Sequence, residues 1–480
     1  MKNTATRYLF RTLSLFFFLA FLQSCGGSGG GGSSSPPGIL FYALTEDSGG
    51  HGFIAENAIS PSGQLYPSSP APISTGGATS STKDTGPVTF VLDPSASLAF
   101  ALNSNSSPSS FNPGSIESYN TSSAQSSTGI QSVSYTATGT NPSSMAIDPG
   151  GNYLVVADHG SRSGSTPGDV KIFQIGSTGT LSGPTTISLT SNTPPCPNPD
   201  KIVFPPSGSN GTSSDIFYVV CSSPELILSS SSPPTPALYR CTISGTCSPI
   251  TLSGLSSSSN AISNMEFASN GTAFLPGETY SSSSSYSAFL ITCTGAPLSS
   301  CSTLSPVSSR TGTAPAGDFA IDNAPPLTAF IGNYSTNTSG NISNPGIFFS
   351  CTATSCASTN PTYSSSGAAT FLATNPGQTN LYIVSTAAPL PTTTSSISNS
   401  SSNPGTIFTC PLPSASPCTS TGTTGSYPVG ITFDPSGKFA FVPTWSGTIS
   451  IFQVGANGSL TPAASPTVTT GRLNLQVVVP

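Results

Sequence analysis

Charged side chains are scarce in this sequence of 480 residues. Lysine and arginine number 11 and aspartate and glutamate 17, so only 6% of the residues carry charge, against about 25% in ordinary soluble domains. Lys2, Arg7 and Arg11 lie at the N-terminus, which leaves 8 of the 11 basic residues against 17 acidic ones in the rest of the chain. No basic patch remains, which argues against nucleic acid as a partner.

Histidine, tryptophan and long apolar runs are also rare. The chain has two histidines, one tryptophan and four arginines beyond residue 24, whereas acid–base catalysis needs a histidine or carboxylate with a tuned pKa. Only 35% of the residues are apolar, and Ser, Thr, Asn, Gly and Pro dominate the remainder. These residues favour strands and turns over helices. The composition therefore predicts an all-β, loop-rich fold with a thin core.

The first 24 residues have the pattern of a signal peptide. Basic residues precede the apolar run 13–22, which is too short for a membrane-spanning helix of about 20 residues. The run ends in Leu22-Gln23-Ser24-Cys25, which resembles the bacterial lipobox, where a peptidase cleaves before a cysteine that carries diacylglycerol. We therefore expect a signal peptide over 1–24 and lipidation of Cys25. The alternative is ordinary secretory cleavage that leaves Cys25 as a free thiol.

A flexible tether follows the predicted anchor. Residues 26–37 read GGSGGGGSSSPP and contain no core-forming side chain. We expect the lipidated cysteine and tether to occupy 25–37 and the folded domain to occupy 38–480. This organisation places the domain in the bacterial cell envelope, on the periplasmic or cell-surface side of the membrane to which the lipid attaches it.

The cysteines indicate an oxidising compartment. Without Cys25 ten remain, an even number, and no C-x-x-C pair typical of zinc sites occurs. Four pairs flank short polar turns, and the two remaining cysteines form a fifth pair. The spacing therefore predicts the structural disulfides Cys241–Cys247, Cys293–Cys301, Cys351–Cys356, Cys410–Cys418 and Cys196–Cys221.

A repeat organises the sequence from residue 88 onward. Apolar strands flank a turn that often reads Asp-Pro, as at Pro94, Pro149 and Pro435, and six intervals between Pro94 and Pro435 average about 57 residues. A period of this length with four strands and Gly/Pro turns is typical of a β-propeller blade. The alternative is a string of β-sandwiches.

The two ends of the chain together supply one further blade. Residues 39–77 contain three strands without a first one, and residues 472–480 form a lone strand. Seven complete repeats and this composite give a propeller of eight four-stranded blades, closed by N- and C-terminal strands in one blade.

Two segments, 147–182 and 431–461, carry a family resemblance. Both run from Ile-Asp-Pro-Gly or Phe-Asp-Pro-Ser-Gly through a second strand to Ile-Phe-Gln-Ile or Ile-Phe-Gln-Val. They resemble the lactonase-type β-propeller family, which includes bacterial phosphogluconolactonases and muconate-cyclising enzymes, and the chain is interpreted as an exported lipoprotein member. The resemblance implies seven blades, the alternative to the eight counted here. It identifies no matching catalytic set.

Long Ser/Thr/Asn-rich loops follow the second strand of each repeat, at 103–114, 158–168, 222–235, 277–287, 332–346 and 385–405. In a four-stranded meander these loops share one face, and loops on a rigid scaffold are where binding usually occurs. The rare polar residues also gather there. The binding candidates are Asp158, His159, Arg162, Tyr280, Trp445 and His51, and the candidates for acid–base chemistry are His159, Arg162, Glu278 and Asp47. The alternative is that these are solvated loop residues.

Two functional hypotheses follow. The first is a non-catalytic binding or scaffold module that recognises a carbohydrate or protein through the loop face. The second is a lactonase-like hydrolase that acts on a sugar lactone at the central channel. No cofactor or metal is expected, since no D-x-[DN]-x-[DN]-G calcium loop occurs, and a monomer is favoured.

Overall fold

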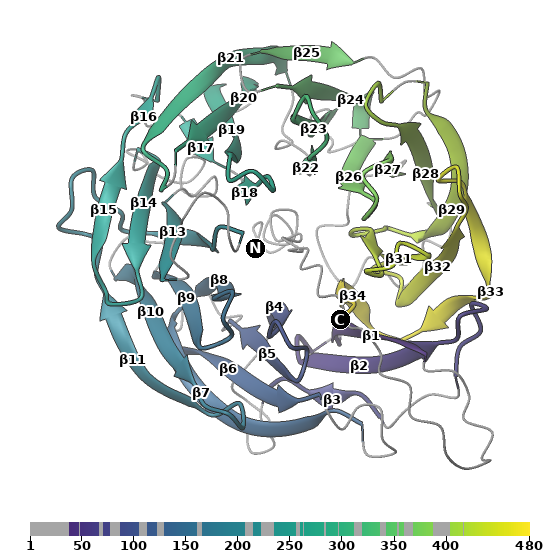
Figure 1. Cartoon of the computed structure of the whole chain (residues 1–480), viewed down its shortest axis with the longest axis horizontal. Coiled ribbons are helices and arrows are strands. Elements are labelled where there is room, and N and C mark those ends of the chain that lie inside the picture. The colour runs from purple at the N-terminus through teal and green to yellow at the C-terminus, as the bar shows by residue number, and fades with distance from the viewer. Residues whose placement is uncertain are drawn as a thin grey trace.

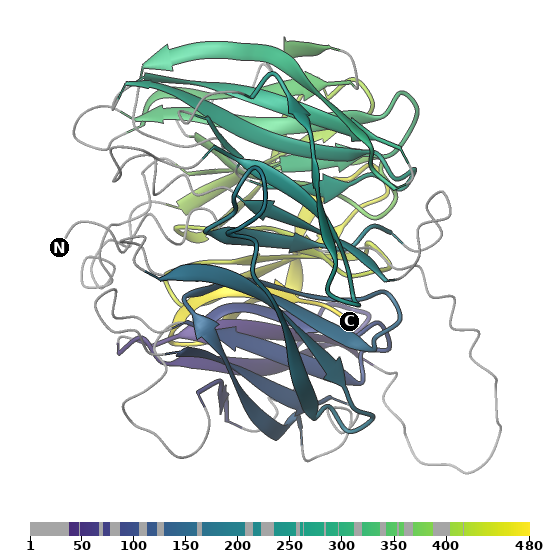
Figure 2. The same ribbon diagram turned by 90° about the vertical axis from the view of Figure 1, so that its left-hand side faces the viewer.

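The chain forms a ring of eight β-sheets, arranged like blades around a common axis (Figure 1; edge-on in Figure 2). All regular elements described are strands. The expected β-propeller is confirmed, with eight blades instead of the seven implied by the resemblance. The computed structural model describes residues 38–47, 49–66, 71–76, 87–104, 113–121, 129–160, 166–206, 215–221, 235–255, 260–262, 264–282, 285–295, 297–311, 319–336, 342–352, 355–359, 368–386, 404–415 and 417–480.

The predicted signal peptide, Cys25 and the tether lie outside the described residues. Within the described ranges, no helix is both long and apolar enough to cross a membrane.

In each blade the first strand lies nearest the axis and the last lies at the rim (Figure 1). The first blade contains β34 (Leu473–Val478), β1 (Ile39–Glu46), β2 (Gly52–Ile59) and β3 (Ile73–Ser74). The second contains β4 (Pro87–Leu92), β5 (Leu98–Asn103), β6 (Pro113–Asn120) and β7 (Gln131–Thr140). The third contains β8 (Pro142–Ile147), β9 (Tyr153–Gly160), β10 (Pro167–Ile175) and β11 (Leu181–Ile187). The fourth contains β12 (Pro199–Val203), β13 (Ile216–Cys221), β14 (Ala237–Thr242) and β15 (Cys247–Ile250).

The remaining blades follow the same order. The fifth contains β17 (Asn260–Ile262), β18 (Glu266–Phe267), β19 (Ala273–Ser282), β20 (Ser285–Thr294) and β21 (Ser300–Thr311). The sixth contains β22 (Phe319–Asp322), β23 (Thr328–Thr336), β24 (Ile342–Cys351) and β25 (Cys356–Thr359). The seventh contains β26 (Ala368–Thr374), β27 (Asn380–Thr386), β28 (Pro404–Pro411) and β29 (Thr419–Ser426). The eighth contains β30 (Thr432–Phe433), β31 (Phe439–Pro443), β32 (Thr448–Val454) and β33 (Leu460–Thr469).

The fifth sheet departs from the four-stranded pattern. Its inner strand is divided into β17 and β18, and its rim gains β16 (Leu252–Ser253), which pairs in parallel with β21. β16 belongs to the connection that leaves the fourth blade, so the connection itself protects this sheet edge.

The C-terminal strand closes the ring as predicted. β34 pairs with β1 and so supplies the inner strand of the first blade. The side chain of Asn474 is fully buried and donates hydrogen bonds to the carbonyls of Thr444 (3.0 Å) and Thr448 (2.9 Å) in the eighth blade. On the other side, Gln476 accepts from the N–H of Phe90 (2.9 Å) and donates to its carbonyl (3.2 Å). One strand therefore joins three consecutive blades.

The hydrophobic core lies between blades. Each sheet has two apolar faces, and each cluster draws side chains from neighbouring sheets; Phe41 of the first blade packs on Phe441 of the eighth, with ring centroids 4.6 Å apart. A blade buries its apolar surface only when both neighbours are present, so the stability of this fold depends on closure.

The Asp residues of the repeated turns stabilise the turns themselves. The carboxylates of Asp93, Asp148 and Asp434 accept hydrogen bonds from backbone N–H groups two to five residues later. In the last of these turns the donors are Ser436 (3.0 Å) and Phe439 (2.6 Å). This local capping explains why the repeat carries aspartate there.

All five predicted disulfides are present. Four close short hairpins with Cα–Cα distances of 4.0–4.2 Å, and Cys196–Cys221 spans 5.5 Å between Cα atoms. On the chain-entropy view each small ring contributes roughly 2–3 kcal/mol. Five bridges fit an oxidising, extracytoplasmic environment.

Candidate functional site

The predicted polar residues lie within or beside strands of separate blades. Asp47 and His51 flank the turn between β1 and β2 of the first blade, Asp158 and His159 lie in β9 of the third, and Glu278 lies in β19 of the fifth. Arg162 lies outside the described residues. The structure thus brings together two neighbouring pairs, and it places the catalytic candidates that it describes in three different blades.

The first pair stabilises its own turn. The imidazole Nδ1 of His51 lies 3.1 Å from both carboxylate oxygens of Asp47. Partial burial raises the pKa of Asp47, but hydrogen bonds from the backbone and side chain of His51 and from the N–H of Gly49 outweigh it and lower that pKa. Asp47 therefore remains ionised at neutral pH and is occupied by its own turn.

Asp158 is a buried carboxylate with a cationic partner. Its Oδ2 lies 3.2 Å from Nζ of Lys171 on the adjacent strand β10, and the carboxylate accepts hydrogen bonds from Thr138 Oγ1 (3.0 Å) and the N–H of Gly139 (2.8 Å). Lys171 also lies 2.5 Å from Asp169. The two donors from residues 138 and 139 come from β7 of the second blade, so this ion pair connects neighbouring blades.

Burial and the neighbouring charges shift the pKa values of both partners. Burial raises the pKa of Asp158 to about 7, although Lys171 and Thr138 act in the opposite direction. Burial lowers the pKa of Lys171, but the carboxylates of Asp158 and Asp169 outweigh it and raise that pKa. The side chains of Asp158 and Lys171 are only 2% and 14% exposed. Their arrangement suits a structural ion pair inside the scaffold.

His159 belongs to strand β9, where a loop was predicted. Its N–H donates to the carbonyl of Asn141 (2.9 Å), and its carbonyl accepts from Nδ2 of Asn198 (2.8 Å). The same Nδ2 lies 3.5 Å from the ring Nδ1. The backbone of His159 is thus held by residues on both sides of the third blade.

Two of the other candidates are buried. Glu278 is only 2% exposed within β19. Trp445, expected to bind ligand, is 5% exposed and packs in the core cluster between the seventh and eighth blades. Tyr280 lies in β19, but its side chain falls outside the described part of the structure. Among the described residues, no three His, Cys, Asp or Glu side chains form a group that could hold a metal ion.

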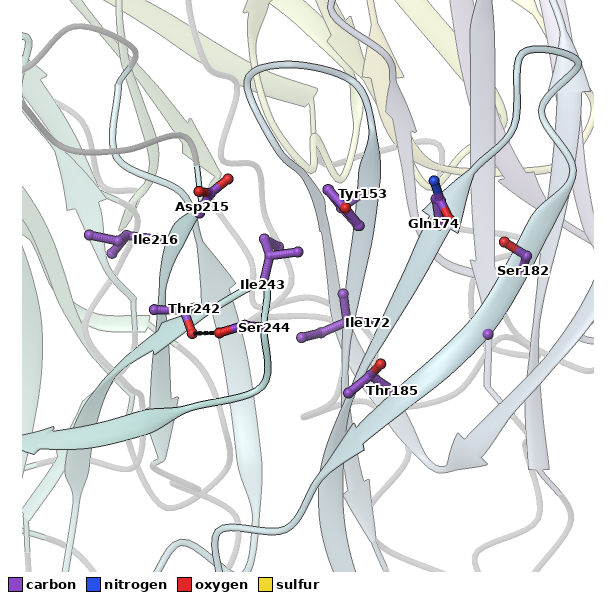
Figure 3. A pocket seen from close by; sticks show the side chains of 11 residues that line it. Tyr153, Ile172, Gln174, Ser182, Thr185, Asp215, Ile216, Thr242, Ile243 and Ser244 are labelled. Atoms are coloured by element: carbon purple, nitrogen blue, oxygen red, sulfur yellow. Dashed lines mark hydrogen bonds between the residues drawn. The ribbon is translucent and has the colours of Figure 1, made fainter.

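A groove on the opposite face was not predicted. It lies between the third and fourth blades, at the ends joined by short turns, and has a volume of about 710 Å³ (Figure 3). Ile172, Ile216 and Ile243 supply aliphatic surface, and Tyr153 lies between them and Gln174. The rest of the wall consists of Ser182, Gly183, Thr185, Asp215, Thr242 and Ser244.

The chain is similar to solved structures at low sequence identity. No protein-family model matches it, and no curated protein shows significant sequence similarity. A Bacteroides fragilis protein provisionally assigned as a 6-phosphogluconolactonase is 12% identical, with 94% of this chain and 100% of that one covered, at a TM-score of 0.49. The periplasmic gluconolactonase PpgL of Pseudomonas aeruginosa is 13% identical, with 92% and 99% covered, at 0.45. Sqt1 from Chaetomium thermophilum is 13% identical, with 80% and 85% covered, at 0.48.

Proposed function

We propose that this protein is a lipid-anchored, extracytoplasmic binding or scaffold module that recognises a carbohydrate or a protein through its loop face. The observation that carries the proposal is the engagement of charged groups near that face. Asp47 bonds to its own turn, and Asp158 bonds to Lys171 and to the neighbouring blade. These two described carboxylates therefore serve the scaffold, and the proposal assigns recognition to neutral side chains of the loops.

The chemistry of the loop sequences supports this proposal. They consist largely of Ser, Thr, Asn, Gly and Pro, which offer hydroxyl and amide groups for neutral hydrogen bonding. Loops carried by a rigid scaffold are the usual place for binding sites. A closed ring cross-linked by five disulfides provides such a scaffold.

Binding should depend on the loops. We expect residues 26–480, expressed without Cys25, to bind a member of an immobilised panel of neutral glycans and envelope proteins. Replacement of 222–234 and 387–403 by short Gly-Ser linkers should weaken that binding by at least about tenfold, or about 1.4 kcal/mol. As a control, Asn457→Ser alters a turn on the opposite face and should leave binding unchanged. Equal binding by the loop-replaced and parent proteins would count against the loop face.

The lipid anchor has a separate test. We expect labelled palmitate to enter the wild-type protein in a bacterial host and to be absent from Cys25→Ala, because the thiol of this cysteine in the lipobox-like sequence is the group that carries the diacylglycerol and its acyl chains. The variant should be released from the membrane fraction. Labelling that persists in Cys25→Ala would refute the assignment.

A further inference from the structure

We infer that the groove between the third and fourth blades is a second binding site, which takes a neutral hexose unit of a glycan. It lies on the face of the ring opposite the loops, so the inference does not depend on the proposed loop-face function. Its volume of about 710 Å³ falls within the roughly 300–1,000 Å³ of small-molecule sites.

The same position in the ring is closed at another blade interface. Between the eighth and first blades, the side chain of Gln453 donates to the carbonyl of Ser62 (3.1 Å). The N–H of Ser465 donates to the carbonyl of Gly63 (2.9 Å), and its hydroxyl accepts from the N–H of Leu65 (3.1 Å). Three hydrogen bonds thus seal the turn of one blade onto the next.

The interface between the third and fourth blades has an equivalent turn and an equivalent glutamine, but it lacks these hydrogen bonds. The turn 242–246 has the same hydrogen bonds as the turn 60–64, and Gly245 (φ +92°) occupies the position of Gly63 (φ +84°). Gln174 of Ile-Phe-Gln-Ile corresponds to Gln453 of Ile-Phe-Gln-Val. Yet no hydrogen bond within the described structure joins the Gln174 side chain to the turn, so the interface opens into a groove.

The polar groups of the groove suit a saccharide. In the described structure, the Tyr153 hydroxyl, the Gln174 amide and the Ser182 and Thr185 hydroxyls make no protein hydrogen bond, and together they offer donors and acceptors to hydroxyl groups. The aliphatic wall and the tyrosine ring provide apolar contact, as small-molecule sites usually do. Figure 3 shows these side chains around a common space.

The charge of the lining residues determines which sugars the groove favours. The described residues that line the groove include no lysine or arginine, and Asp215 is the one carboxylate among them. A phosphate or carboxylate on the ligand would meet no cation and would be repelled by Asp215. The groove therefore favours neutral sugars over sugar phosphates and uronic acids.

Saturation-transfer NMR on the folded domain tests the inference. The probes are maltotriose, cellotriose, laminaritriose and chitotriose, with glucose 6-phosphate as the charged comparison. We expect at least one trisaccharide to bind and glucose 6-phosphate not to bind. Gln174→Ala should weaken binding about fivefold through a lost hydrogen bond, and Ser182→Arg, which fills the groove from the rim strand β11, should abolish it. Melting temperatures confirm that each variant is folded.

Two controls make the result specific. Gln453→Ala removes the corresponding glutamine from the sealed interface and should leave sugar binding unchanged. The loop-replaced protein should also retain it, which separates this site from the loop face. Absence of saturation transfer to all four trisaccharides, or equal transfer with Ser182→Arg, would overturn the inference.

Discussion

Deletion of residues 472–480 should prevent the protein from folding into a stable monomer. The deletion removes β34, exposes the inner edge of β1 and breaks the bonds that Asn474 and Gln476 make to the eighth and second blades. An exposed strand edge promotes aggregation, and the core between the first and eighth blades loses its closure. Size-exclusion chromatography and circular dichroism should show aggregated or unfolded protein.

Point variants separate closure from simple truncation. Asn474→Ala removes two hydrogen bonds that a fully buried amide donates to the carbonyls of Thr444 and Thr448, which keep backbone donors, and should cost roughly 1–3 kcal/mol of unfolding free energy. The matched control Asn457→Ala, on an exposed turn of the eighth blade, should cost much less.

Opening one small ring with Cys410→Ser and Cys418→Ser should leave a folded protein, less stable by roughly 2–3 kcal/mol. A truncated protein as stable as the wild type would refute the closure account.

Lys171→Met should destabilise the protein by about 3–5 kcal/mol at pH 8, because it leaves the buried Asp158 carboxylate without its cation. Denaturant unfolding measures the loss. The double variant Asp158→Asn with Lys171→Met should recover much of it, since only Asp169, whose side chain is 29% exposed, then lacks its cation. A neutral effect of Lys171→Met would show that the pair contributes nothing to the scaffold.

The protonation of Asp158 makes the stability of the folded protein depend on pH. Burial holds the pKa of Asp158 in the folded protein at about 7, above its value near 3.9 in an unfolded chain. Such a group binds its proton more tightly in the folded state, so its contribution reduces stability as pH rises from about 4 to about 7. Removal of Lys171 enlarges this effect, and the loss in Lys171→Met should therefore be smaller at pH 5 than at pH 8.

The repeat and the four hairpin disulfides were predictable because each is encoded locally, and the closing strand was predictable because the first blade lacks one strand and the C-terminus supplies a lone one. The Asp-Pro turns cap themselves, and Cys241–Cys247 and its counterparts join cross-strand neighbours, so spacing alone identifies them. The roles of the polar residues were harder to predict from the sequence. Asp158 resembled a loop residue, whereas its partners are Lys171 across the strand and Thr138 from another blade, contacts that depend on the packing of the ring.

The groove between the third and fourth blades could not be predicted from the sequence either. Gln174 and Gln453 occupy equivalent sequence positions, and nothing in the sequence alone indicates that one seals an interface and the other does not. The two interfaces differ in the hydrogen bonds that the next blade's turn makes to the preceding blade, which depend on the packing of the ring. Likewise, Trp445 was selected as a binding candidate because it is the single tryptophan of the chain, and the structure packs it in the core between two blades.

The most direct test of the proposed function is turnover of aldonolactones. A pH-stat assay with gluconolactone and 6-phosphogluconolactone measures whether the folded domain accelerates hydrolysis over the uncatalysed rate. A binding module whose described ionisable groups serve the scaffold should give no acceleration. Saturable hydrolysis that disappears in His159→Ala, at an unchanged melting temperature, would contradict the account and identify the protein as a lactone hydrolase.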